Sequence, residues 1–184
     1  MLRAVPVAQE PLRVFGQLMH VDDVRDGPQF MNGRQGATAL HAILECEEKD
    51  DRDGQQYHFV ENRKLWNHVA SLSFEQFTQK VDYSRGSVRE QVVHLFDAED
   101  VWFSELRGVE PAEPLPDSDV DDRDSIRILW DNVEQNTRTY LSELQDDMLF
   151  AKPIKEPEED KDLIVWQVLL HVANHATDHR AQLL

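Results

Sequence analysis

Three histidines stand close together near the end of the printed chain, in the stretch LLHVANHATDHRAQLL over residues 169–184. His171, His175 and His179 are spaced four apart, so on an α-helix they lie on successive turns. Residues four apart differ by about 40° around the helix axis, so the three histidines form a stripe that winds slowly around the helix. His175 and His179 border or enter the apolar face, whereas His171 lies further toward its edge. Inside a helical bundle such a pair can bind one metal ion, because both imidazoles reach the same point.

A third metal ligand should come from another helix, since two protein ligands are seldom enough. His94 is the best candidate, because VVHLFDAEDVW over residues 92–102 places it midway along a helix, on the flank of the apolar face. The remaining histidines lack a partner at metal-binding spacing; they are His20, His41, His58 and His68. The residues alone leave two interpretations open, a metal site or ordinary buried and surface histidines.

Glu99 is an unexpected residue in the same helix, because helical geometry places it in the middle of the apolar face. Burying an unpaired carboxylate is costly, so Glu99 should have a partner or a raised pKa. One interpretation is functional: Glu99 accepts a proton in catalysis or orients a metal-bound histidine. The other is structural: Glu99 accepts a buried hydrogen bond from a Tyr, Trp, Asn or Arg on another helix.

Four stretches from residue 57 onward have the apolar spacing of helices. They cover residues 57–72, 84–108, 123–149 and about 161–184. In the second, Ser87 and Glu90 predict a capping box at the start and Gly108 predicts the end. The proline-containing, acidic segment 109–122 predicts a long loop. No stretch shows a convincing strand pattern, so we expect an all-α protein, a four-helix bundle with a long crossover loop.

The first 55 residues differ from the rest, since they hold five of the seven glycines and end in a charged run. We expect residues 1–55 to form a partly disordered N-terminal extension. Within it, the apolar spacing in residues 37–48 predicts one short helix. Residues 56–184 are expected to form the helical bundle.

Composition excludes several classes of partner. The formal charge of −17 argues against binding the phosphate backbone of nucleic acids, which requires clustered Lys and Arg. No apolar run approaches the ~20 residues of a membrane span, and no secretory signal is visible. Cys46 is the single cysteine, so an internal disulfide cannot form. We therefore expect a cytoplasmic protein that binds neither nucleic acid nor membranes.

Two segments resemble the signatures of one family, in the same order along the chain. HVANHATDHRAQ over residues 171–182 resembles the C-terminal NHxxxHRGQ signature of the DinB-like (DinB/YfiT) superfamily, with Ala181 in place of the usual Gly. VVHLFDAEDVWFSELRG over residues 92–108 is similar to its second-helix segment, and ENRKLWNHVASLSFEQF to its first helix. The resemblance covers about residues 57–184. Relatives commonly continue past this point, so it also implies a bundle truncated at the C-terminus.

The resemblance implies a four-helix bundle in up-down-down-up order, with a divalent metal held by three histidines. Matched residue by residue, these ligands are His94, His175 and His179, and His171 is not one of them. Zinc or nickel would suit three nitrogen ligands, while iron and manganese stay open. Family members often form homodimers, so a homodimer is a further expectation.

The family also indicates a function, because its members include thiol S-transferases and thiol-dependent isomerases that use bacillithiol, mycothiol or glutathione. The first hypothesis is therefore an enzyme that activates a low-molecular-weight thiol for attack on a small-molecule electrophile, with Glu99 orienting one ligand. A second hypothesis is a non-catalytic, stress-induced metal-binding protein. A third is a metal-dependent hydrolase. Arg180, beside the ligand His179, is expected to face solvent rather than form an ion pair.

Overall fold

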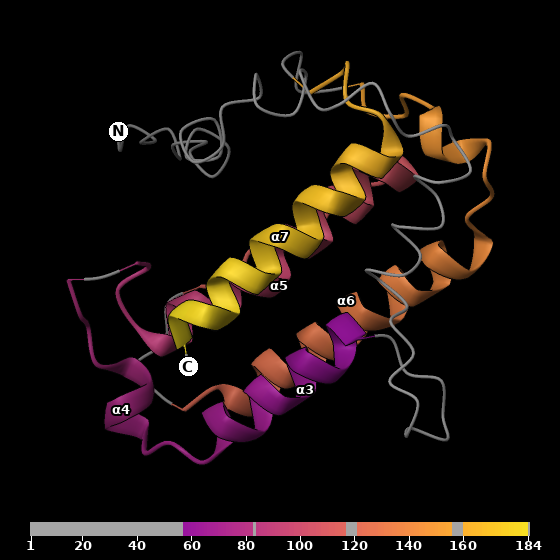
Figure 1. The fold of residues 1–184 in the computed structure, drawn as a ribbon. Coiled ribbons are helices and arrows are strands. Elements are labelled where there is room, and N and C mark those ends of the chain that lie inside the picture. The colour runs from indigo at the N-terminus through magenta and orange to yellow at the C-terminus, as the bar shows by residue number, and fades with distance from the viewer. Residues whose placement is uncertain (1–56, 83, 117–120, 156–159, 184) are drawn as a thin grey trace, which may run out of the picture. The chain divides into compact units, whose positions relative to one another are not determined.

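The computed structural model describes residues 57–82, 84–116, 121–155 and 160–183, which belong to one compact unit. In these ranges the chain forms α-helices and one short 3-10 helix, and no strand. The elements are α3 (Tyr57–Ala70), α4 (Phe74–Thr78), α5 (Val88–Arg107), α6 (Arg123–Glu143), η2 (Met148–Phe150) and α7 (Val165–Leu183). The all-α prediction is confirmed (Figure 1). The predicted extension over residues 1–55, with its short helix, lies outside the described residues.

The four long helices correspond to the four predicted stretches, but some of their ends differ. The first stops at Ala70, and Ser73 caps a separate short helix, α4, that was not predicted. The third stops at Glu143, where the next residue turns to extended backbone, and η2 follows. The fourth begins at Val165, later than expected. The apolar spacing continues through these turns, which is why the sequence alone overestimates the lengths.

The two ends of α5 lie at the predicted residues, but the predicted capping box is only half formed, because the Glu90 carboxylate accepts from the Ser87 hydroxyl instead of the Ser87 backbone N–H. The hydroxyl of Ser87 accepts a hydrogen bond from the N–H of Glu90, and it donates one to the Glu90 carboxylate at 2.8 Å. Gly108 ends the helix in the left-handed conformation, with φ at 67°. Glycine adopts this conformation without steric cost, so the stop is encoded locally.

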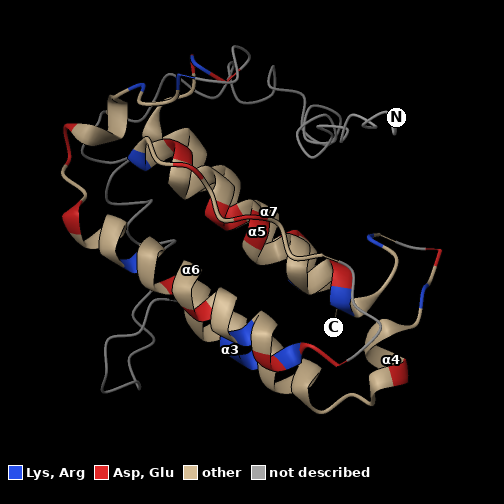
Figure 2. Ribbon diagram, turned by 180° about the vertical axis from the view of Figure 1, so that it is seen from behind, with Lys and Arg blue, Asp and Glu red and all other residues tan. Residues whose placement is uncertain are grey.

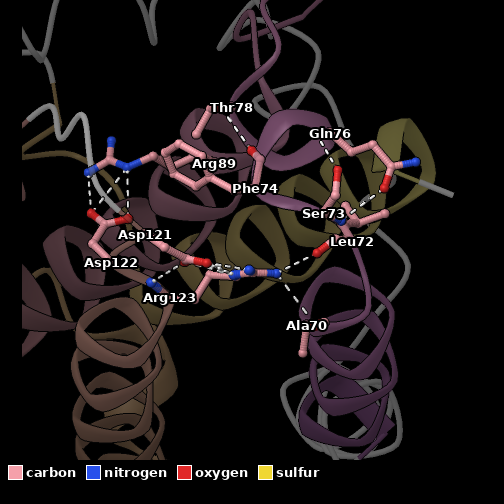
Figure 3. Close-up of polar contacts among 10 residues, drawn as sticks. All are labelled: Ala70, Leu72, Ser73, Phe74, Gln76, Thr78, Arg89, Asp121, Asp122 and Arg123. Carbon is pink, nitrogen blue, oxygen red and sulfur yellow. Dashed lines mark hydrogen bonds and ion pairs between the residues drawn. The ribbon is translucent and has the colours of Figure 1, made fainter.

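Two arginines fix one end of the bundle (Figure 3). Arg89, at the start of α5, is buried and binds the carboxylate of Asp122 just before α6, with Nη2 to Oδ2 at 2.6 Å. The same nitrogen donates to the carbonyl of Pro116 in the loop between these helices. Arg123, the first residue of α6, donates to the carbonyl of Leu72 beyond α3 at 2.7 Å. The end of α3 and the starts of α5 and α6 therefore meet at one end.

These contacts define the directions of the helices. Because α5 and α6 start at the same end, they run in parallel, and α3 runs the opposite way. The end of α7 reaches the start of α5, where Gln91 donates to Gln182 at 2.9 Å, so α7 runs antiparallel to α5. Figure 1 shows α7 along α5 and α3 along α6. The order is up-down-down-up, as the resemblance implied.

Charged residues of both signs lie along α3 and α6 (Figure 2). Arg63 on α3 is 3.5 Å from Glu134 on α6, and Glu134 also pairs with Arg138 at 2.7 Å. Trp66 packs its edge against Trp130, with ring centroids 5.9 Å apart. Polar and apolar contacts thus hold α3 against α6. No helix in the described part of the chain has the length and apolar character to cross a membrane.

Two apolar clusters fill the interior. The first includes Phe59, Phe103, Tyr140, Leu149 and Val165. The second includes Leu65, Phe77, Leu95, Trp130 and Ala176. Five of the buried polar side chains interact with one another, and we call them the polar layer; they are His58, Asn62, Glu99, Thr137 and Arg180. Burial of the apolar clusters drives association of the helices, whereas the polar layer must satisfy its own hydrogen bonds.

Candidate metal centre

Three predicted residues meet between α5 and α7. His94 comes from α5, and His175 and His179 come from successive turns of α7; we call them the histidine triad. Each offers one ring nitrogen, and these nitrogens lie within 4.8 Å of one another. Nε2 of His94 is 3.1 Å from Nε2 of His175. Three nitrogens on one tetrahedral zinc lie roughly 3.4 Å apart, so small side-chain adjustments would let the triad hold one ion.

Electrostatics keep the triad neutral. Burial, together with the positive charge of Arg85 and a contribution from His179, lowers the pKa of His94 to about 3. Burial also lowers the pKa of His175 to about 3, helped by the neighbouring histidines and Arg85. The pKa of His179 is lowered too, first by burial and then by Arg85. A neutral imidazole is the form that binds a metal, so the rings are held in their metal-binding state.

His171, the third histidine of the original stripe, lies outside the triad. Its ring packs against Trp102, with centroids 5.1 Å apart, and stacks on His175 at 5.9 Å. It is partly buried, as His175 is. His171 therefore forms part of the surroundings of His175.

Two glutamines hold His179, and the sequence had not singled them out. The side-chain amide of Gln91 hydrogen-bonds to Nδ1 of His179 and also donates to Oε1 of Gln182. A metal on Nε2 of His179 requires the ring proton on Nδ1, so the Gln91 amide would then turn its oxygen toward Nδ1 to accept from it. Gln91 lies three residues before His94, and Gln182 three after His179, so both are one turn from a triad residue. This spacing is the feature of the sequence from which both glutamines could have been predicted to lie near the triad.

Arg85 is a second residue that sequence reasoning missed. It precedes α5, and its Nη2 lies 3.0 Å from Nε2 of His94. Burial lowers the pKa of Arg85 from its usual value, although a guanidinium keeps its charge at neutral pH. A metal on Nε2 of His94 would need this guanidinium to move aside. Arg85 therefore lies directly beside the triad.

Glu99 is buried as predicted, but its partner is a residue that the sequence gave no reason to choose. Its Oε2 lies 3.1 Å from Nε2 of His58 on α3. Asn62, one turn further along α3, contacts the same ring nitrogen at 3.3 Å. Among the described residues, the predicted contact between Glu99 and a triad histidine is absent. The hydrogen-bonded structural interpretation is closer, with histidine as the partner instead of Tyr, Trp, Asn or Arg.

The polar layer keeps Glu99 ionised. Burial raises the pKa of Glu99, but the nearby His58, Thr137 and Arg180 outweigh it and hold the pKa below its usual value. Oε1 of Glu99 and the hydroxyl of Thr137 are both buried, and neither meets the distance and angle of a hydrogen bond with a described residue. The carboxylate is therefore stabilised mainly from the side of His58.

The prediction that Arg180 faces solvent is wrong. Arg180 is buried, and it donates to Oδ1 of Asn62 at 2.9 Å and to the hydroxyl of Thr177 at 3.0 Å. Although Arg180 directly follows His179, its side chain turns toward α3. The two adjacent residues therefore serve different sites, His179 in the triad and Arg180 in the polar layer.

Comparison with known proteins identifies one family. The sequence model of the DinB family matches residues 53–184, which is well over half of the chain. The match begins shortly before α3 and includes every helix described above. No curated protein matches the chain.

Proposed function

Because the chain belongs to the DinB family, we propose that His94, His175 and His179 bind one divalent metal ion. The observation that carries this proposal is the convergence of three ring nitrogens from two helices within 4.8 Å. Their lowered pKa values support it, since no proton must be removed at neutral pH. Zinc or nickel suits three nitrogen ligands best, with iron or manganese as alternatives.

We propose further that the site serves thiol chemistry, as a thiol S-transferase or a thiol-dependent isomerase acting on a small molecule. A divalent metal with three protein ligands keeps a position open, where it lowers the pKa of a bound thiol. His179 is buried, whereas His94 and His175 are only partly covered, so a ligand approaches from the side of the latter two. A reducing cytoplasm, the location that we propose, keeps such thiols reduced.

In the proposed transfer, the thiolate sulfur forms a bond to an electrophilic carbon. The leaving group departs with the bonding electron pair, and the thiol proton passes to solvent. The protein contributes position: neutral imidazoles that converge, and Gln91 that fixes the ring of His179. Glu99 is proposed to act indirectly, by fixing α5 against His58 on α3, because it is buried away from the open side.

Metal content tests the ligand assignment. We expect about one metal ion per purified chain by mass spectrometry, and a clear loss in His94→Ala, His175→Ala and His179→Ala. His68→Ala is the matched control, because His68 is exposed on α3 and should leave the metal content unchanged. Full metal content in all three triad variants would contradict the assignment of these histidines as metal ligands.

Consumption of thiol tests the chemistry. Metal-loaded protein should consume a low-molecular-weight thiol in the presence of a haloarene or an epoxide, and His94→Ala should abolish this. If no electrophile leads to consumption while metal binding stands, the chain is a metal-binding protein without this activity. Turnover of an ester in the absence of any thiol would instead indicate a hydrolase.

A further inference from the structure

Arg85 differs from most other arginines of the described chain in what it contacts. Several of these arginines form ion pairs with Asp or Glu: Arg63, Arg89, Arg107, Arg123, Arg127 and Arg138. Arg85 instead donates to a neutral histidine, with Nη2 3.0 Å from Nε2 of His94. The chain carries 36 acidic against 19 basic residues, so carboxylate partners are plentiful elsewhere. Arg85 has no carboxylate partner among the described residues, and its guanidinium contacts the triad. It can therefore bind an anion from outside the chain.

The backbone holds Arg85 in this place. Its neighbours on both sides have positive φ, 52° at Ser84 and 96° at Gly86. A residue other than glycine at position 86 would be strained by this φ, and its Cβ would push aside the Glu90 carboxylate, whose Oε2 would lie 2.9 Å away. Ser84 has a side chain and still adopts the left-handed conformation, which is unfavourable unless other contacts enforce it.

The contacts that enforce it come from the two glutamines beside the triad. The hydroxyl of Ser84 hydrogen-bonds to Oε1 of Gln91 at 2.8 Å and to Oε1 of Gln182. Gln91 is also the residue that holds the ring of His179. One hydrogen-bond network therefore fixes both the segment that carries Arg85 and a proposed metal ligand, so Arg85 stays beside the site when its side chain moves.

We propose that Arg85 determines specificity by binding the carboxylate of an acidic low-molecular-weight thiol whose sulfur occupies the open position at the triad. A metal on Nε2 of His94 would displace the guanidinium from that nitrogen but would leave its charge beside the triad. The planar guanidinium then offers paired donors that match a carboxylate. This inference rests on the proposed function, because it assumes that the thiol binds at the metal.

The test compares two thiols of similar size on cobalt-loaded protein, 3-mercaptopropionate with a carboxylate and 2-mercaptoethanol without one. Binding is followed by the sulfur-to-cobalt absorption band, which needs no turnover. Because one charged hydrogen-bonded contact is involved, the wild-type protein should prefer the acidic thiol by about 10- to 100-fold in Kd. In Arg85→Gln the two Kd values should become equal, and Arg85→Lys should keep part of the preference. Arg63→Gln, on α3, is the matched control and should keep all of it.

Cobalt stoichiometry and circular dichroism check that each variant is loaded and folded. If Arg85→Gln fails to fold, Arg85→Lys takes its place, and its preference for the acidic thiol should be smaller than that of the wild-type protein. Absence of any preference in the wild-type protein, or an unchanged preference in a folded Arg85 variant, would overturn the inference while thiol binding stands. If neither thiol changes the cobalt spectrum, the proposed thiol function fails, and the inference fails with it.

Discussion

Nε2 of His58 lies 3.1 Å from Oε2 of Glu99, and both side chains are buried. The pair joins α3 to α5, while Arg180 reaches Asn62 and so joins α7 to α3. A shift of any of these helices would leave a buried polar group without its partner, which is costly. The polar layer therefore favours one alignment of the helices that carry the triad.

Removing His58 should destabilise the fold strongly. His58→Ala leaves the Glu99 carboxylate buried without its main partner, and losing one member of a buried pair costs about 3–5 kcal/mol. Urea unfolding followed by circular dichroism measures this change in the free energy of unfolding. His68→Ala, an exposed change on the same helix, should stay within about 0.5 kcal/mol of the wild-type protein. A comparably small effect for His58→Ala would show that the pair contributes little.

Glu99 should make the fold sensitive to acid. Its pKa in the folded protein is below the unfolded value, which is about 4.3 for a glutamate. The stability that Glu99 contributes is therefore fully present above that pH and is lost as pH falls through the lower, folded pKa. Melting temperatures between pH 3 and 7 should show this loss in the wild-type protein. In Glu99→Gln the acid-side dependence should shrink; an unchanged profile would contradict the role of Glu99.

The helices and the triad could largely be predicted from the sequence, because their signals are local. Ser87 and Gly108 mark the ends of α5 through contacts with residues a few positions away. The spacing of His175 and His179 places both on one side of α7 wherever that helix packs. His94 as the third residue needed the family resemblance as well, since nothing local links α5 to α7.

The partners of the polar groups could not be predicted in this way. His58 and Glu99 are 41 residues apart, and only the assembly of the bundle brings them together. Arg180 had no neighbour in the sequence that would explain its burial, because Asn62 lies 118 residues away. Arg85 depends on backbone with positive φ at a serine, which no sequence pattern indicates. Long-range packing decided each of these contacts.

Asp97 on α5 should destabilise the folded protein at neutral pH. Burial, with a contribution from the charge of Asp100, raises the pKa of Asp97 to about 6. Since the folded pKa exceeds the unfolded value, ionisation opposes folding, and stability falls as pH rises from about 4 to 6. Asp97→Asn should therefore stabilise by about 1–2 kcal/mol at pH 7, after allowance for partial exposure, and by almost nothing at pH 4.

Urea unfolding at the two pH values checks this prediction for Asp97. Asp146→Asn, in the exposed segment after α6, is the control and should not show such a difference between pH 4 and pH 7. Equal effects of Asp97→Asn at both pH values would mean that the change acts through packing or hydrogen bonding and not through charge.

Gln91 should tune metal affinity through the ring of His179. The Gln91 side-chain amide hydrogen-bonds to Nδ1 of His179. Removing such a partner from the ring nitrogen that does not bind the metal typically lowers metal affinity 10- to 100-fold. Gln91→Leu should weaken zinc binding by about that factor, measured by competition with a chromophoric chelator. Gln91→Glu should bind at least as tightly as the wild-type protein, because a carboxylate accepts from Nδ1–H and makes Nε2 more basic. Gln135→Leu, exposed on α6, controls for the loss of an amide. Wild-type affinity in Gln91→Leu would show that His179 is oriented by other contacts.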